Sequence, residues 1–396
     1  MKKFDIVIGI PSLKEADNIA FVAKQASRGI KKYFPGKNSV IVNVDNNSPD
    51  GTGEAFLSAK TKIPKVYIPT PKGVLGKGNN LKNLFRFANE TKAKAIMVVD
   101  ADIRSITPEW IKNLITPIFK GYDYVSPIYS RHKYDGTITN NLCYPIVYGI
   151  FGIDMRQPIG GDFAFSEKLN NFWIKRRWHE STKQYGIDIF MTSHAIFGDF
   201  KIAETGLGAK IHKPSAPKLG AMFSQVIRTL FINIINRRKK WESRKFIRKL
   251  DTFGLKKMDP PQELHVNLHK IEEVAKERFA EYRFLIESSI TKGVFKKIDN
   301  MVNENRFEFD HKLWAKALFD LIGSYARTMD KGEIVECAKA LYFLRSASFI
   351  HETWHLNNDL ANEKIEEQAR YFFEKRDYLI RKLRFLKNRK RKKVLV

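Results

Sequence analysis

The chain has 396 residues, of which 43% are hydrophobic, and it contains 29 Phe, 14 Tyr and 6 Trp. This length and composition allow a large core in one or two domains and exclude a chain that is disordered throughout. The 70 Lys and Arg residues against 43 Asp and Glu give a formal net charge of +27. Such an excess attracts anions, whether nucleic acid, acidic lipid headgroups or phosphorylated small molecules, and does not choose among them.

The cysteines and the apolar segments limit where the chain works. Cys143 and Cys337 lie far apart and fit no metal-binding spacing, so we expect no disulfide framework and a reducing compartment, the cytoplasm. The apolar stretch 4–10 is interrupted by Asp5 and is too short for a signal peptide, so it predicts a first strand. No uninterrupted run of about 18 apolar residues occurs, and we expect no transmembrane helix.

Strands and helices alternate in the first half of the chain. The predicted strands are 4–10, 39–44, 65–68 and 95–99, and the predicted helices between them are 16–34, 52–59 and 79–91. The last of these strands is apolar throughout, as expected where both faces of a sheet are covered. This βαβα order predicts a mostly parallel, doubly wound α/β sheet, in which ligands bind at the carboxyl ends of the strands.

From about Leu219 the pattern becomes helical. Apolar residues recur at helical spacing over 222–235, 268–285, 334–342 and 365–386, and the last run leads into the almost wholly basic segment 387–393. The C-terminal part is therefore predicted to be all-helical. We divide the chain at this change, into an α/β domain of residues 1–218 and a helical region of residues 219–396 with a basic tail.

Asp100 and Asp102 directly follow the apolar strand 95–99. Two carboxylates at i and i+2 at a strand exit can converge on one hard cation, and Mg²⁺ or Mn²⁺ would complete its shell with phosphate oxygens and water. Such a cation neutralises a diphosphate leaving group as a Lewis acid. The alternative is an Asp-rich turn that caps the next helix at Ile106-Thr107-Pro108. Because this D-x-D pair follows a buried strand in an α/β pattern, we favour the metal site.

Two glycine-rich segments carry further polar residues. In Gly73-Val74-Leu75-Gly76-Lys77-Gly78 the glycines would let the backbone approach a phosphate, and Lys77 would add a positive charge where a helix begins. The spacing fits neither a Walker A motif nor the dinucleotide fingerprint, and a surface turn is the alternative. In Gln157-Pro158-Ile159-Gly160-Gly161-Asp162, backbone amides and the acid would face a substrate, with a hairpin turn as the alternative.

Two later residues are candidates for the same site. Asp188 lies at the start of a predicted helix and is either a charge at the helix N-terminus or an acceptor for sugar hydroxyls. His212 lies in the run Lys210-Ile211-His212-Lys213-Pro214. A lone histidine is more often structural than a metal ligand, and this one becomes a candidate ligand if the fold returns it to Asp102.

Taken in order, these segments resemble the GT-A glycosyltransferase fold. Residues 11–15 and 45–52, which follow the first two strands, resemble the nucleotide-binding segments of that superfamily. The whole set is similar to a narrower group, the retaining mannosylglycerate synthases and glucosyl-3-phosphoglycerate synthases. The similarity covers residues 4–220 and rests on 76–78, 100–102, 131–139, 157–161, 185–188 and His212. The helical part matches only in general character.

The resemblance implies a role for each matching residue. The residues implied in donor binding are Pro11, Leu13, Glu15, Asp45, Gly76, Lys77 and Asp100, with Glu15 and Asp45 at the base and ribose. Asp102 and His212 would ligate the metal, Asp100 would contact the sugar or the metal shell, and Asp188 would bind donor-sugar hydroxyls. The catalytic group would be Lys77, Asp100, Asp102 and Asp188. The residues implied in acceptor binding are Arg131, Thr139, Gly160, Gly161 and Asp162.

The implied activity is that of a hexosyltransferase. Glucose or mannose would move with retention from a GDP- or UDP-sugar to glycerate or 3-phosphoglycerate, and the leaving phosphate would take the proton of the attacking hydroxyl. Two positions depart from the group: Asp162 stands where glutamate is usual, and Gly-Asn-Asn follows Lys77 where mannosylglycerate synthase has an acidic residue. No carboxylate pair clearly supplies a nucleophile for double displacement.

Two other functions stay open on the sequence. An inverting transferase that uses a lipid-phosphate or polysaccharide acceptor would dock on anionic membrane through the basic C-terminal helix. A nucleic-acid-binding protein would use the +27 charge and the run Arg389-Lys390-Arg391-Lys392-Lys393, whose alternative is a solvated, frayed terminus. A homodimer is an assembly that the sequence allows.

Overall fold

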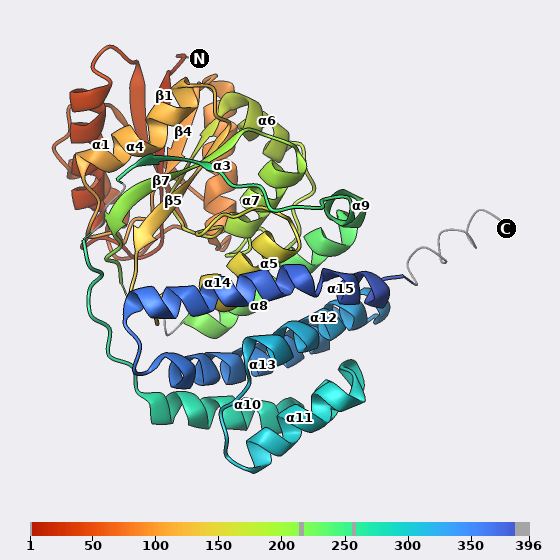
Figure 1. Ribbon diagram of the computed structural model, residues 1–396. Helices are drawn as coiled ribbons and strands as arrows, with labels where there is room; N and C mark the ends of the chain where they lie inside the picture. The colour runs from red at the N-terminus through yellow and green to blue at the C-terminus, as the bar shows by residue number, and fades with distance from the viewer. Residues whose placement is uncertain (1, 214–217, 256–258, 385–396) are drawn as a thin grey trace. The chain divides into compact units, whose positions relative to one another are not determined.

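A computed structural model describes residues 2–213, 218–255 and 259–384 (Figure 1). The chain divides into two compact units. The first comprises Met1–Arg131, Met155–Leu230 and Lys249–Gln262, and the second His132–Asp154, Phe231–Arg248 and Glu263–Val396. The expected single boundary after residue 218 does not coincide with this division, because segments of the two units alternate along the chain. The basic run 387–393 lies outside the described residues.

The first unit contains a sheet of eight strands in the order β3-β2-β1-β4-β6-β5-β7-β8. The strands are β1 (Ile6–Ser12), β2 (Ser39–Asp45), β3 (Lys65–Pro69), β4 (Ala95–Val98), β5 (Tyr124–Ser130), β6 (Phe163–Ser166), β7 (Ile202–Ala209) and β8 (Asp251–Gly254). β6 is antiparallel to both β4 and β5, and the other pairs in this order are parallel. The predicted mostly parallel α/β sheet is therefore confirmed.

Helices cover both faces of this sheet. They are α1 (Ile19–Tyr33), α2 (Thr52–Ser58), α3 (Lys77–Glu90), α4 (Pro108–Phe119), α6 (Glu167–Ile174) and α7 (Ile187–Phe197). Alternate residues of β1 point to opposite faces, as strand geometry requires. Ile8 joins the core that α1 and α4 cover, whereas Gly9 lies against Leu84 of α3 on the other face. This two-sided packing explains why the central strands are apolar throughout.

β8 corrects the prediction of an all-helical C-terminal part. It adds a parallel edge strand beside β7, and Tyr122 holds it through a hydrogen bond from its hydroxyl to Asp251 (2.5 Å) and an edge-on contact with Phe253. Three of its four residues are exposed. A short strand with so little apolar surface gives no periodic signal in the sequence.

Among the described residues, one helix, α8 (Leu219–Asn236), has the length and apolar composition to span a membrane. Its mean hydropathy is 1.2 over 18 residues, and 44% of that window is buried, so the expectation that no such segment exists is not confirmed. The side chain of Gln225 accepts a hydrogen bond from the backbone of Tyr185 (3.0 Å), and Thr229 bonds Ser181 (2.8 Å). These bonds, with the buried Phe223 and Ile227, are those of a core helix, which passes the same test of length and composition.

The second unit is helical. Its elements are the π-helical turn η1 (Thr139–Cys143), α5 (Tyr144–Gly149), α9 (Arg238–Glu242), α10 (Leu268–Ser289), α11 (Lys292–Asn303), α12 (His311–Arg327), α13 (Lys331–Thr353), α14 (Asn358–Glu374) and α15 (Arg376–Lys382). The helices predicted at the places of α10 and α13 are confirmed. α11 and α12 were not predicted, and the last predicted helix is two helices, α14 and α15.

Candidate active site

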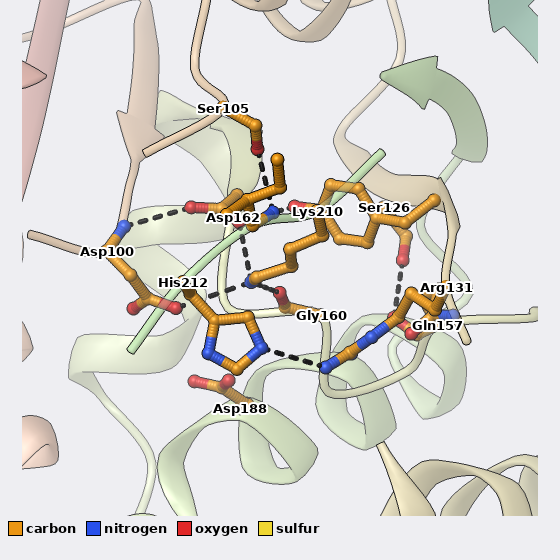
Figure 2. Close-up of polar contacts among 12 residues, drawn as sticks. Asp100, Ser105, Ser126, Arg131, Gln157, Gly160, Asp162, Asp188, Lys210 and His212 are labelled. Atoms are coloured by element: carbon orange, nitrogen blue, oxygen red, sulfur yellow. Dashed lines mark hydrogen bonds and ion pairs between the residues drawn. The ribbon is translucent and has the colours of Figure 1, made fainter. Parts of the chain in front are cut away.

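Polar side chains gather where β4, β5 and β7 end. Asp100 and Asp102 follow β4, Arg131 follows β5, and Lys210 and His212 follow β7. β6 runs antiparallel to β4 and β5, and β7 runs parallel to β5, so all three strands end at the same edge of the sheet. Asp162, the residue before β6, lies at this edge too because its strand runs the other way. Figure 2 shows the side chains of Asp100, Arg131, Asp162, Lys210 and His212 facing one another.

Asp100 is held between two lysines. Nζ of Lys77 lies 2.8 Å from Oδ1 of Asp100, and Nζ of Lys210 lies 3.6 Å from Oδ2. Burial alone would raise the pKa of this carboxyl group, but the two ammonium groups outweigh burial and lower its pKa to about 2. Asp100 is therefore ionised at any physiological pH.

Asp162 is fully buried and uses both carboxylate oxygens internally. Oδ1 accepts a hydrogen bond from the backbone N–H of Asp100 (2.9 Å), and Oδ2 accepts from Lys210 (2.9 Å) and from the Tyr129 hydroxyl. No exposed oxygen remains for a substrate. The predicted acceptor-binding role of Asp162 is thus replaced by a positioning role, because the carboxylate fixes the backbone of the D-x-D segment.

Lys210 is a site residue that the sequence reasoning missed. Its side chain is 6% exposed. Nζ donates to the carbonyl oxygen of Gly160 (2.7 Å) as well as to Asp162, and it lies 4.9 Å from the centre of the Tyr129 ring. The available signal was a lysine directly after the run Gly206-Leu207-Gly208-Ala209, where a buried cation requires an acidic partner.

The glycine turn before β6 lets Asp100 occupy its place. Gly161 has φ +87°, and a Cβ there would lie 2.1 Å from Oδ2 of Asp100. A Cβ on Gly160 would lie 2.5 Å from the Pro127 ring. The second glycine segment therefore contacts the D-x-D pair directly, and its predicted part in an acceptor pocket stays a prediction.

Lys77 joins Asp100 to Asp188. Its Nζ lies 3.3 Å from Asp188, which is buried in the first turn of α7. Burial raises the pKa of Asp188, against the opposing effect of Lys77. Oδ1 of Asp188 accepts no hydrogen bond among the described residues, although Nζ of Lys77 lies 3.3 Å from it as an ion pair. A buried acceptor oxygen of this kind is suited to a hydroxyl donor from a ligand.

The N-terminal amides of α3 do not form the predicted phosphate site. The N–H groups of Gly78 and Asn79 donate to the carbonyls of Gln184 (3.2 Å) and Lys183 (2.9 Å). The N–H of Gly76 donates to the side chain of Asn46 (2.9 Å). The glycines instead permit close packing, since a Cβ on Gly78 would lie 2.0 Å from the carbonyl oxygen of Thr182.

The residues predicted to bind the nucleotide lie at the ends of β1 and β2. Asp45 is fully buried and accepts hydrogen bonds from Ser12 (2.6 Å), the Ser48 amide (2.7 Å) and Tyr67 (3.1 Å). It therefore fixes the strand ends and acts on any nucleotide through them. Pro11 is buried within β1, and Leu13 is the first residue after that strand.

Glu15 follows β1 and is paired with a lysine. Its Oε2 accepts a hydrogen bond from Lys213 (2.7 Å), which also bonds Asp17 (2.7 Å). Burial raises the pKa of Glu15, and Lys213 opposes that effect. These ion pairs connect the segment after β1 to the residue that follows His212.

His212 and Asp102 lie close enough to interact electrostatically, as the metal hypothesis requires. Burial and then the neighbouring Asp100 raise the pKa of Asp102, while Lys210 and His212 lower it. Nδ1 of His212 lies 2.7 Å from the carbonyl oxygen of Lys213, and Nε2 lies 3.3 Å from Nη2 of Arg131. One tautomer satisfies both contacts, with Nδ1–H as the donor and the Nε2 lone pair as the acceptor.

These residues fit a divalent cation that takes its other ligands from a substrate. No group of three or more His, Cys, Asp and Glu side chains arranged for a metal ion occurs within residues 2–213, 218–255 and 259–384. A carboxylate whose charge is opposed by burial and by a second carboxylate gains from a nearby cation, and Asp102 is such a group. Mg²⁺ commonly binds through one or two carboxylates plus phosphate oxygens. A site in which Asp102 and His212 are the protein ligands is consistent with this mode of binding.

Thr139 does not belong to the same unit as Arg131. It is buried at the start of η1 in the second unit, whereas Arg131 is the last residue of the first segment of the first unit. Their predicted joint grip on an acceptor carboxylate stays a prediction.

Comparison with known proteins gives a family match over part of the chain. Residues 7–176 match the family model of Glycosyl transferase family 2. The first unit has an α/β fold of the GT-A type, and residues 7–176 are similar to glycosyltransferases of this family. The matched segment contains Lys77, the D-x-D pair, Arg131 and Asp162, whereas Asp188, Lys210 and His212 follow it. No curated protein matches the chain.

Solved structures similar to the chain include glucosyl-3-phosphoglycerate synthase from Mycobacterium tuberculosis. Its complex with Mg²⁺ and UDP is 22% identical, with a TM-score of 0.46, over 58% of this chain and 79% of that chain. Its complex with Mn²⁺, UDP-glucose and phosphoglyceric acid is 22% identical, with a TM-score of 0.45 and the same coverage. Its complex with Mn²⁺, UDP-glucose and glycerol 3-phosphate is 22% identical, with a TM-score of 0.45, over 58% and 80%.

Proposed function

We propose that the chain is a retaining, metal-dependent glycosyltransferase. It moves glucose or mannose from a nucleotide diphosphate sugar to glycerate or 3-phosphoglycerate, in the cytoplasm. The observation that carries the proposal is that Asp102 and His212 both lie at the carboxyl edge of the sheet, close enough to interact electrostatically. Beside them, Lys77 holds Asp100 and Asp188.

The residues at this edge have separate tasks in the proposed reaction. A bound Mg²⁺ or Mn²⁺ would neutralise charge on the diphosphate leaving group, and Asp102 and His212 would hold it. Lys77 keeps Asp100 and Asp188 in place, and the Asp188 carboxylate, whose Oδ1 is ion-paired with Lys77 but accepts no hydrogen bond, would accept a hydroxyl of the donor sugar. Arg131 binds the anionic group of the acceptor, because its planar fork matches a carboxylate or phosphate.

A thermal-shift panel tests the donor and the cation. UDP-glucose, UDP, GDP-mannose and GDP are each added to the full chain with Mn²⁺, with Mg²⁺ and with chelator. A donor at 100 times its Kd should stabilise the chain by about 2.7 kcal/mol, by mass action. Asp102→Asn should remove the metal-dependent part of that shift. Asp5→Asn is the matched control. Asp5 lies just before β1 and pairs with Lys94, which lies just before β4.

Product analysis tests the acceptor and the stereochemistry. Glycerate, 3-phosphoglycerate and glycerol 3-phosphate are offered with the best donor. The anomeric proton signal of the product should show the configuration of the donor sugar. Inversion would remove the assignment to the retaining group, and a shift in melting temperature that is equal with and without metal would remove the metal from the proposal.

A further inference from the structure

We propose that Arg131 competes with the divalent cation for Nε2 of His212, so that cation binding releases Arg131 to the acceptor anion. This inference rests on the proposed metal-dependent transfer and adds an order of binding to it. It concerns one contact, 3.3 Å between Nη2 of Arg131 and Nε2 of His212 (Figure 2).

The fold brings these two side chains together. Arg131 is the first residue after β5, and His212 is the third after β7. β5 and β7 are parallel neighbours whose last residues, Ser130 and Ala209, are in register. The guanidinium and the imidazole thus project from adjacent strand ends, and their contact needs no distant loop.

The imidazole ring is held so that one lone pair faces Arg131. Nδ1 contacts the carbonyl oxygen of Lys213 at 2.7 Å. The preceding residue is also fixed, because the carbonyl of Ile211 accepts from the Arg104 amide (2.8 Å) and its own N–H donates to Ser105 (2.9 Å). A histidine whose Nδ1–H binds a backbone carbonyl is oriented to give Nε2 to a metal. That nitrogen has one lone pair, so a guanidinium N–H and a metal ion exclude each other there.

The excess negative charge of the site favours a positive group at the position of Arg131. The carboxylates of Asp100, Asp102, Asp162 and Asp188 face two ammonium groups, those of Lys77 and Lys210, which leaves a net charge of −2 with His212 neutral. The guanidinium of Arg131 reduces this excess to −1. The guanidinium is always charged, and it lies beside Nε2 of His212, the nitrogen to which a cation would bind. A divalent cation supplies two positive charges and cancels the excess of −2 by itself, so Arg131 can then leave.

The competition predicts a reciprocal coupling between the two ligands. If Arg131 blocks the cation, removing it tightens cation binding, and if the cation frees Arg131, the cation tightens anion binding by the same factor. Allosteric couplings in proteins are usually about 5- to 150-fold. We expect a change of about tenfold here.

Binding of Mn²⁺ to the full chain, without substrates, tests the first half. Free Mn²⁺ is measured by electron paramagnetic resonance. Arg131→Met should tighten binding about tenfold, whereas the control Lys213→Met should change it less than about twofold, because that ammonium pairs with Glu15 and Asp17. Equal tightening in both variants would reduce the effect to general charge and overturn the competition.

A double-mutant cycle tests whether the effect passes through the imidazole. In a His212→Gln background, Arg131→Met should no longer tighten Mn²⁺ binding. A full effect in that background would overturn the inference, since the competition would then not involve Nε2.

Anion binding tests the second half. The probe is 3-phosphoglycerate, titrated by calorimetry with and without saturating Mn²⁺. Mn²⁺ should tighten the native chain's binding about tenfold and should have no effect on Arg131→Met. If Mn²⁺ binding itself does not depend on Asp102, the proposed function fails. If it depends on Asp102 but not on Arg131, only the competition fails.

Discussion

At the level of single residues, neighbours decide what each carboxylate of the site can do. Asp162 is buried among three hydrogen-bond donors and fixes the D-x-D backbone. Asp100 is pinned between two lysines and stays ionised. Asp102 has a raised pKa and lies near His212, which leaves it as the carboxylate that gains most from a cation. The three side chains are identical, so burial and pairing alone separate their roles.

Gly161 is expected to be essential to the position of Asp100. Gly161→Ala places a Cβ 2.1 Å from the Asp100 carboxylate in a backbone with φ +87°. Gly73→Ala is a matched control, because Gly73 has φ +80° with no heavy atom within 4 Å of the added Cβ. The control should lose about 1–2 kcal/mol, the cost of a left-handed backbone. Gly161→Ala should lose more and should lower turnover on the order of 100-fold, as a displaced catalytic group does.

Chemical denaturation and steady-state kinetics of the two variants separate the contributions. Equal losses of stability, with turnover intact in both, would mean that the turn tolerates the methyl group. The placement of Asp100 against Gly161 would then not matter to the reaction.

At the level of elements, the sequence predicted the ends of the strands well and the packing between loops poorly. Apolar runs followed by polar clusters located β1, β2 and β4, and with them Glu15, Asp45 and the D-x-D pair. Local pattern could not show that the amides at the start of α3 are used by the loop before α7, because the partner is about a hundred residues away in sequence. Lys210 was missed because its partner Asp162 is also distant in sequence and a buried ion pair leaves no periodic signal.

Two helical glycines should respond oppositely to the same substitution. Gly78→Ala in α3 drives a methyl group to 2.0 Å from the Thr182 carbonyl, which separates α3 from the loop before α7 and breaks the pairing of Lys77 with Asp188. Gly293→Ala in α11 meets no heavy atom within 4 Å. It should stabilise the chain by about 0.4–1 kcal/mol, because alanine loses less backbone freedom on folding.

Thermal melts compare the pair, and donor titrations follow for any variant that folds. We expect Gly78→Ala to be destabilised and to bind the donor more weakly. A stabilised Gly78→Ala would show that the α3 terminus is open, which would restore it as a candidate phosphate site.

For the whole molecule, the two cysteines report on the second unit alone. Cys143 and Cys337 are both buried there, and burial raises the pKa of Cys337 to about 12. Thiolate is the reactive form, so at pH 8 Cys337 stays almost entirely in its unreactive thiol form. A thiol reagent should therefore modify neither cysteine in the folded chain and both in denaturant.

The same labelling measures whether the units open together. The chain passes from one unit to the other five times. We expect ligands that stabilise the first unit, UDP with Mn²⁺, to slow thiol labelling in the second, because binding lowers the population of opened chains. A labelling rate that is the same with and without these ligands would mean that the second unit opens by itself.

The charge of the molecule is spread widely enough that the basic tail need not define its function. Residues 385–396 hold six Lys and Arg and no acid, so a chain ending at Arg384 keeps +21 of the +27. We expect the full chain to bind random duplex DNA at low salt and to lose most of that affinity near 0.2 M salt, as counterion release requires. The shortened chain should bind duplex more weakly, with a smaller salt slope, and should keep its Mn²⁺-dependent stabilisation by the donor. Duplex binding that persists at 0.2 M salt and vanishes with the tail would instead favour a nucleic-acid function.

Sedimentation of the same two chains with anionic vesicles separates a membrane-docking tail from both, since vesicle binding confined to the full chain would support an acceptor at the membrane surface.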